Sequence, residues 1–88
     1  MRTIFKTKLW FNESYQIVKL PEGFELLSLQ VQDHQPTMWY ICDSEAPHVE
    51  TEIMMCGTGW NLESEIKKKN YLGTLQNGPL VWHFFKLG

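Results

Sequence analysis

The chain of 88 residues has the length of one domain, and a hydrophobic content of 43% with 14% aromatic residues indicates a folded globule. Its formal net charge of −2 argues against a nucleic-acid-binding protein, since such proteins concentrate positive charge on one surface. No apolar run approaches the roughly 20 residues of a membrane-spanning helix, and no secretory signal follows Met1, so we expect a cytoplasmic protein that contacts no membrane.

Turn signals divide the chain into runs of strand length; they lie at residues 21–23, 33–36, 46–47, 57–59 and 77–79. In the first run, residues 3–11, apolar and polar side chains alternate, as they do in a half-buried strand. Residues 15–20 form the next run, and the short turn between the two runs predicts a hairpin.

The runs that follow differ in their patterns. In residues 27–32, Leu27, Leu29 and Val31 alternate with polar side chains, which predicts one face in the core and one in water. Residues 37–42 have no polar side, so they predict either a central strand covered on both faces or part of a contact surface. The remaining expected strands are residues 51–56, 71–76 and 80–87, the last two joined by a hairpin at Asn77-Gly78.

Residues 61–70 break the β pattern and predict a short helix. Asn61 is a suitable N-cap, and the acidic residues stand four positions before lysines, the favourable order for helical ion pairs. Together, the chain predicts a single all-β domain over residues 1–88. We expect an antiparallel sandwich or partly open barrel of about seven short strands, with one short helix near residues 61–70.

The histidines and cysteines do not form a recognisable metal or catalytic motif. His34, His48 and His83 stand alone, and Cys42 and Cys56 are fourteen positions apart, whereas zinc ligands usually come in close pairs. Both cysteines lie in apolar runs and are expected to be reduced and buried. We therefore expect no metal, no cofactor and no enzymatic activity; a small hydrolase is a remote alternative.

Gly57-Thr58-Gly59 is the segment best suited to hold an anion. It follows a predicted strand and precedes the predicted helix, a setting in which backbone N–H groups bind phosphate or carboxylate. It lacks the further glycines and the lysine of a phosphate-binding loop. A tight turn or bulge that needs positive φ is the other interpretation.

The chain holds more aromatic side chains than one small core needs. Strand alternation puts Trp39 and Tyr40 on opposite faces, and likewise Trp82 and His83, so we expect part of this surface to line a ligand cleft or an interface between subunits. The alternative is a sheet that is covered on both faces. The candidate ligand-binding residues are Gly57, Thr58, Gly59, Trp60, Trp39, Tyr40 and His83.

Several motifs follow one another along the chain. They are Leu-Pro-Glu-Gly at 20–23, Leu-Ser-Leu-Gln-Val-Gln at 27–32, Gly-Thr-Gly at 57–59, Tyr-Leu-Gly-Thr-Leu-Gln at 71–76 and Leu-Val-Trp-His-Phe-Phe at 80–85. In this order they resemble an uncharacterised family of short proteins encoded by phages and prophages. The resemblance implies a phage origin and a small β fold, and it brings no catalytic residues. The lysine-rich stretch before residue 71 departs from the family, in which this region is often proline-rich.

These features lead to two expectations about function, both non-catalytic. In the first, a phage accessory protein antagonises a host defence in the cytoplasm of the host cell by sequestering a small anionic ligand, such as a nucleotide signal. Aromatic side chains and residues 57–59 hold the ligand, at an interface of a homo-oligomer. In the second, an exposed aromatic face and residues 60–70 block a host protein.

Overall fold

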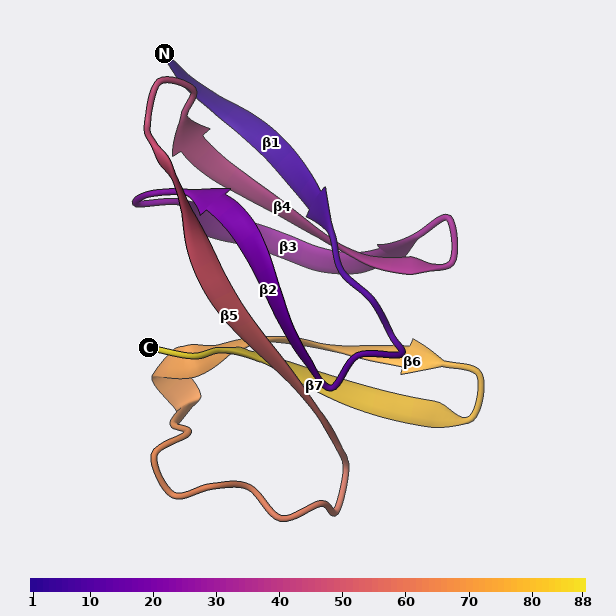
Figure 1. Ribbon diagram of the computed structural model, residues 1–88. Coiled ribbons are helices and arrows are strands. Elements are labelled where there is room, and N and C mark those ends of the chain that lie inside the picture. Colours follow the sequence, from indigo (N-terminus) through magenta and orange to yellow (C-terminus); the bar gives the residue numbers. More distant parts are fainter.

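The computed structural model describes all of residues 1–88 and is an all-β protein (Figure 1). Its strands are β1 (Arg2–Lys8), β2 (Tyr15–Pro21), β3 (Glu25–Gln32), β4 (Gln35–Asp43), β5 (His48–Gly57), β6 (Tyr71–Asn77) and β7 (Leu80–Lys86). Each strand overlaps one of the runs predicted from alternation and turn residues. The predicted class and number of strands are therefore confirmed.

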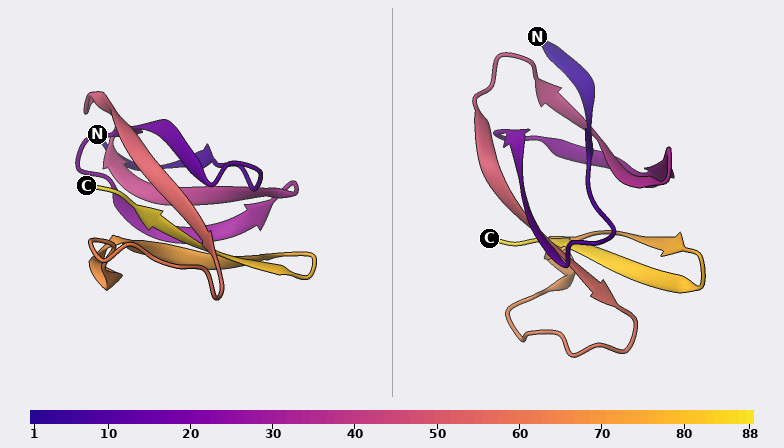
Figure 2. Two further views of the ribbon diagram at one scale, coloured as in Figure 1. Left: turned by 60° about the horizontal axis from the view of Figure 1, so that its bottom comes forward. Right: turned by 45° about the vertical axis from the view of Figure 1, so that its right-hand side comes forward.

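The strands form two antiparallel sheets that pack together like a sandwich. Sheet A has the order β1-β4-β3, and sheet B has the order β2-β5-β7-β6. Figure 2 shows the β2–β5 pair at one end of sheet B and the β6–β7 hairpin at the other. The edge strands β3 and β6 touch, and Gly73 leaves room there for the side chain of Leu29. No strand ladder joins them, so the two sheets do not close into a barrel.

The hairpin predicted between the first two strands is wrong. β1 pairs with β4 and β2 pairs with β5, so the chain crosses from sheet A to sheet B after Lys8. Leu9 is fully buried at the crossing, and its amide donates to the Pro36 carbonyl at 2.7 Å. The Gln16 side chain then bonds both the amide and the carbonyl of Trp10. These buried contacts stabilise the crossing between the sheets more than a hairpin at residues 12–14 would, because the turn there is only a local preference of the sequence.

β3 departs from the predicted alternation because it holds a bulge at Leu27. Leu26 and Leu29 pack against the core, whereas Leu27 and Val31 are 50% and 45% exposed, so these two do not share the buried face predicted for them. β3 and β4 are joined by a two-residue turn. In this turn Asp33 and His34 have φ of 53° and 65°, the backbone of a type I′ hairpin.

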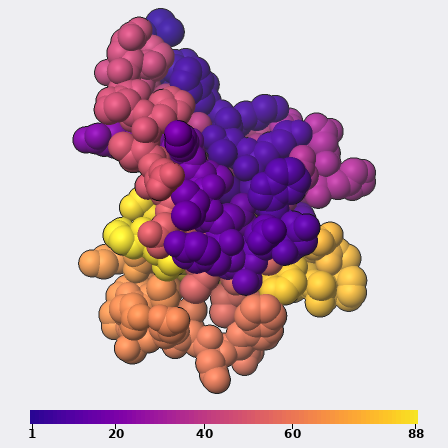
Figure 3. Space-filling view, viewed as in Figure 1, coloured from indigo at the N-terminus to yellow at the C-terminus, as the bar shows by residue number.

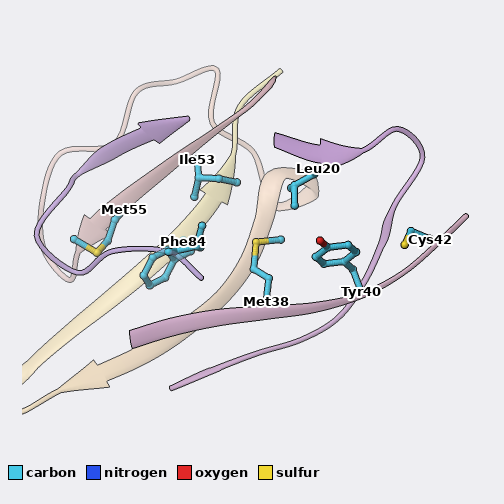
Figure 4. Packing of buried hydrophobic residues seen from close by; sticks show 8 residues of the cluster. Leu20, Met38, Tyr40, Cys42, Ile53, Met55 and Phe84 are labelled. Atoms are coloured by element: carbon cyan, nitrogen blue, oxygen red, sulfur yellow. The ribbon is translucent and has the colours of Figure 1, made fainter. Parts of the chain in front are cut away.

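The core lies between the two sheets (Figure 4). Its buried cluster consists of Leu9, Leu20, Met38, Tyr40, Cys42, Ile53, Met55 and Phe84. β4 is the central strand of sheet A and contributes Met38, Tyr40 and Cys42 to the core. Residues 37–42 thus form a central strand as predicted, but no second layer covers the outer face that carries Trp39 and Ile41. Both cysteines are free and buried, as predicted.

The helix predicted over residues 61–70 is reduced to one 3-10 turn, η1 (Lys68–Asn70). The preceding residues are irregular and run outside the body of sheet B, at the lower edge of Figure 1. The Asn70 side chain accepts from the Lys67 amide and donates to the Lys86 carbonyl, each at 2.9 Å. Because so short a helix is marginal in water, these bonds to the turn and to β7 outweigh the weak helical ion pairs.

Candidate functional site

A small hollow lies where the chain leaves β5 beside β7. Its volume is about 210 Å³, and its lining comprises Cys56, Gly57, Thr58, Gly59, Trp60, Leu62, His83 and Phe85. Five of the seven predicted ligand-binding residues are in this set: Gly57, Thr58, Gly59, Trp60 and His83. Cys56 and His83 are register partners in sheet B, which is why residues 25 or more positions apart meet here.

Residues 57–60 form a tight turn, the second of the two interpretations of the Gly-Thr-Gly segment. The Trp60 amide donates to the Gly57 carbonyl at 3.1 Å, and Gly59 has a φ of +90°, which glycine adopts without strain. A Cβ on Gly57 would lie 2.8 Å from Trp60 Nε1, so the indole closes over the turn only because Gly57 has no side chain. No α-helix follows, so no helix N-terminus contributes to this site.

The turn leaves hydrogen-bond donors free. The amides of Thr58 and Gly59 donate to no group of the protein. Thr58 Oγ1 lies 2.7 Å from His83 Nε2, and Thr74 Oγ1 lies 2.9 Å from His83 Nδ1, so each ring nitrogen has a hydroxyl partner. The Tyr71 hydroxyl bonds Thr74 in turn. Because hydroxyl groups both donate and accept, this chain of contacts orients the ring in either tautomer.

The contacts of His83 resemble part of a catalytic arrangement. A hydroxyl beside an imidazole is the first part of a nucleophile–base pair, and the usual third part is a carboxylate that orients the base. Here the hydroxyl of Thr74 orients His83, and no carboxylate contacts the ring. What the turn offers is two backbone amides, those of Thr58 and Gly59, that have no acceptor within the protein and can donate to a bound group.

Aromatic rings form the walls of the hollow. Trp60 is 55% exposed and meets Trp82 edge to face, with ring centroids 5.3 Å apart. Trp82 packs against the core, and its Nε1 is buried without a hydrogen-bond partner. Phe85 lies 5.8 Å from the ring of Tyr71. Trp60 is therefore a flat exposed surface that is held in place by a ring beneath it.

The structure places Trp39 and Tyr40 away from this hollow, in sheet A. Tyr40 is 2% exposed, packs edge to face with Phe24 and shares a hydrogen bond of 2.8 Å with Thr7, so it is a core residue. Trp39 is on the opposite face of β4, where its register partner is Lys6. The predicted opposite faces are correct, but the two residues do not join the other five.

A larger groove adjoins the hollow and was not predicted from the sequence. This sheet B groove, of about 800 Å³, lies between the outer face of sheet B and residues 60–70. Tyr15 and Met54 line it from the strands, and Trp60, Leu62 and Ile66 line it from the irregular segment. Figure 3 shows that segment, in orange, standing out below the surface formed by β2. Trp60 and Leu62 also line the hollow, so the two sites are neighbours.

Two residues that line the groove, Tyr15 and Met54, belong to an apolar row that crosses all four strands of sheet B. Tyr15 pairs with Met54, Met54 with Phe85, and Phe85 with Tyr71. Register partners share a face, so the row stands on the outer face of the sheet, away from the core. In the sequence these four residues are scattered, and only the strand register aligns them.

The hollow and the groove both lie within a single family domain. The family model described as a domain of unknown function (DUF7352) matches residues 1–88. The chain belongs to the DUF7352 family. No curated protein and no solved structure matches this DUF7352 chain significantly. No helix of the DUF7352 domain is long and apolar enough to cross a membrane.

Proposed function

We propose that this protein is a non-catalytic phage accessory protein that antagonises a host defence by sequestering a small anionic ligand, such as a nucleotide signal, in the host cytoplasm. The observation that supports the binding site is that Thr58 and Gly59, whose amides have no acceptor in the protein, line one hollow with His83 and the exposed indole of Trp60. The resemblance to short phage-encoded proteins supports the origin, and the lack of a carboxylate at His83 supports the non-catalytic role.

The proposed ligand places its anionic group at the turn and its planar group against an aromatic wall. The amides of Thr58 and Gly59 donate to the anionic oxygens, and hydrogen bonds to charged acceptors are roughly twice as strong as neutral ones. A nucleobase then stacks on Trp60 or Phe85, which contributes about 1–3 kcal/mol per base in nucleic-acid-binding proteins.

The hollow contains no lysine or arginine. Binding therefore depends on short-range donors and on stacking, not on long-range attraction. Because salt screens mainly long-range interactions between exposed charges, we expect the affinity to depend only weakly on ionic strength.

We also propose that the protein is a homo-oligomer. Large apolar side chains remain exposed on both sheets, among them Ile4 at 58% and Ile17 at 52%. Such surface is commonly covered by a second subunit. The mass in solution, measured by light scattering, tests this: a monomer at every concentration contradicts it.

A thermal-shift screen against cyclic and linear nucleotides tests the anionic ligand. A ligand at 100 times its Kd stabilises the fold by about 2.7 kcal/mol, which raises Tm by several degrees in a domain of this size. Thr58→Ala and His83→Gln should reduce the shift, while Trp39→Ala in sheet A should leave it unchanged. No shift with any nucleotide, or a full shift in Thr58→Ala, contradicts the proposal.

The sheet B groove favours a second candidate function, a protein inhibitor that blocks a host protein. The observation that favours this function is the apolar row, which lies beside the exposed side chains of Trp60 and Leu62. A partner protein would cover this surface. Thr58 does not line the groove, so Thr58→Ala separates the two functions.

A further inference from the structure

The hollow at residues 57–59 is lined without a permanently charged side chain. None of its eight lining residues is a lysine, an arginine, an aspartate or a glutamate. The adjoining sheet B groove has Glu63, Glu65 and Lys69 in its lining, so its charges are of both signs. An anion in the hollow is therefore held by hydrogen bonds, and no lysine or arginine of the lining compensates its charge.

The turn has two backbone amides in reserve for such an anion. The amides of Thr58 and Gly59 donate to no group of the protein, whereas the Trp60 amide donates to the Gly57 carbonyl. The hydroxyl of Thr58 already shares a hydrogen bond of 2.7 Å with His83 Nε2. The donors that remain are few, so a ligand with many acceptor oxygens leaves some of them unpaired in the hollow.

The small number of donors distinguishes two kinds of nucleotide phosphate. A terminal phosphate monoester carries a charge of about −1.5 to −2 at pH 7 and presents three strong acceptor oxygens. A phosphodiester carries one charge, on two terminal oxygens. In the Born treatment the cost of desolvating an ion rises with the square of its charge, whereas the donors at this turn stay the same. The second charge of a monoester is therefore poorly compensated here.

The size of the hollow points the same way. Its volume of about 210 Å³ is below the roughly 300–1,000 Å³ of sites that enclose a whole drug-sized ligand. Trp60 and Leu62 line both the hollow and the groove, so the rest of a nucleotide extends past them into the groove. These shared walls are apolar, and they suit a flat, uncharged base better than a second phosphate.

We propose that the hollow selects a singly charged phosphodiester, such as that of a cyclic nucleotide, over phosphate monoesters and polyphosphates. The amides of Thr58 and Gly59 donate to its two terminal oxygens, and the base lies against Trp60. This inference rests on the proposed function, since it names the class of anion that the same site takes.

Titration calorimetry with matched pairs of nucleotides tests the selection. Each pair consists of a cyclic 3′,5′-monophosphate and the linear 5′-monophosphate of the same nucleoside, for adenosine, guanosine, cytidine and uridine. At pH 7.5, in the pair that binds best, we expect the cyclic member to bind about tenfold more tightly than the linear one. Equal or tighter binding of the linear member overturns the inference and leaves the anionic-ligand function standing. No binding of any nucleotide overturns both.

The pH dependence of this preference separates charge from shape. The linear monophosphate gains a proton near its second pKa of about 6, so at pH 5 both members of a pair carry one charge. The preference should then shrink to about twofold or less. His83 and Cys56, the titratable groups of the lining, meet equally charged ligands at pH 5 and so act alike on both. A preference that persists unchanged at pH 5 overturns the inference.

A cation placed in the lining should abolish the preference. Leu62 is 45% exposed, so Leu62→Lys adds an ammonium group without emptying the core. The ammonium attracts a dianion about twice as strongly as a monoanion, so the linear member should gain about three- to tenfold relative to the cyclic one. The matched control Leu80→Lys, at a side chain that is 52% exposed and lines neither site, should leave the ratio unchanged. The same ratio of affinities in the two variants overturns the inference.

Discussion

The outer faces of the two sheets follow the same alternation but carry different surfaces. On sheet A the outer face mixes apolar Ile4, Ile41 and Trp39 with polar contacts: Lys6 Nζ donates to Gln32 at 2.6 Å, and Lys8 lies 3.9 Å from Asp33. On sheet B the equivalent positions form the apolar row of Tyr15, Met54, Phe85 and Tyr71. Alternation thus produces two faces in both sheets, but the type of residue on the outer one decides whether it meets water or a ligand.

The connections between strands strengthen this contrast. β3 and β4 of sheet A are joined by only Asp33 and His34, whereas β5 and β6 of sheet B are joined by an irregular segment that ends in η1. Long irregular connections supply most binding surfaces because they do not carry the core. Both candidate sites lie where this connection meets the apolar outer face of sheet B.

The largest expected effect tests whether the outer row of sheet B is a binding surface or a second core. Phe84 is fully buried and Phe85, its neighbour in β7, belongs to the outer row. Phe84→Ala should lower the free energy of unfolding by about 3–5 kcal/mol, as in other cores. Phe85→Ala should cost less than half of that, measured by urea denaturation. Equal losses would mean that sheet B is covered on both faces in the monomer, so its outer face would not be a binding surface that differs from the outer face of sheet A.

A smaller effect is expected at the turn that begins the irregular segment. Gly57→Ala adds a Cβ against Trp60 Nε1 and should destabilise the fold by about 1–3 kcal/mol, as overpacking does. In a Trp60→Ala background the same change should cost far less, because the indole is gone. Denaturation of the four proteins gives the coupling energy. A cost that is the same in both backgrounds would show that Trp60 does not close over the turn.

The smallest effect concerns the polar edge of sheet A. The Glu45 amide, followed by the N-terminal ammonium, holds the pKa of Asp43 below its ordinary value of 3.8. A carboxyl group with a lowered folded-state pKa stabilises the fold above its unfolded pKa, and this contribution is lost as pH falls through the folded value. Asp43→Asn should therefore be less stable than the parent at neutral pH, with the difference shrinking below about pH 4.

The matched control for this change is Asp33→Asn, which removes the same charge from the turn between β3 and β4. Thermal unfolding from pH 2 to pH 7 measures both variants against the parent. If the two variants show the same pH dependence, the contacts of Asp43 do not account for the effect.

The candidate site could be predicted only in part. Residues 57–59 were singled out because glycines after a strand indicate a turn, and Trp60 and His83 because their residue types suit ligands. The structure brings these five together, yet Tyr40 fills the core and Trp39 lies on sheet A. The groove was missed because its residues come from β2, β5 and residues 60–70 and share no local motif.

The sequence by itself determined the strands and turns, because side-chain alternation and the φ preferences of glycine and proline act within a few residues. The tertiary structure alone decided which strands pair, and so separated β1 from β2. It also decided the bulge at Leu27, the loss of the predicted helix and the alignment of Tyr15 with Met54. Those outcomes depend on burial and register between residues far apart in the chain, and single-strand patterns carry no information about either.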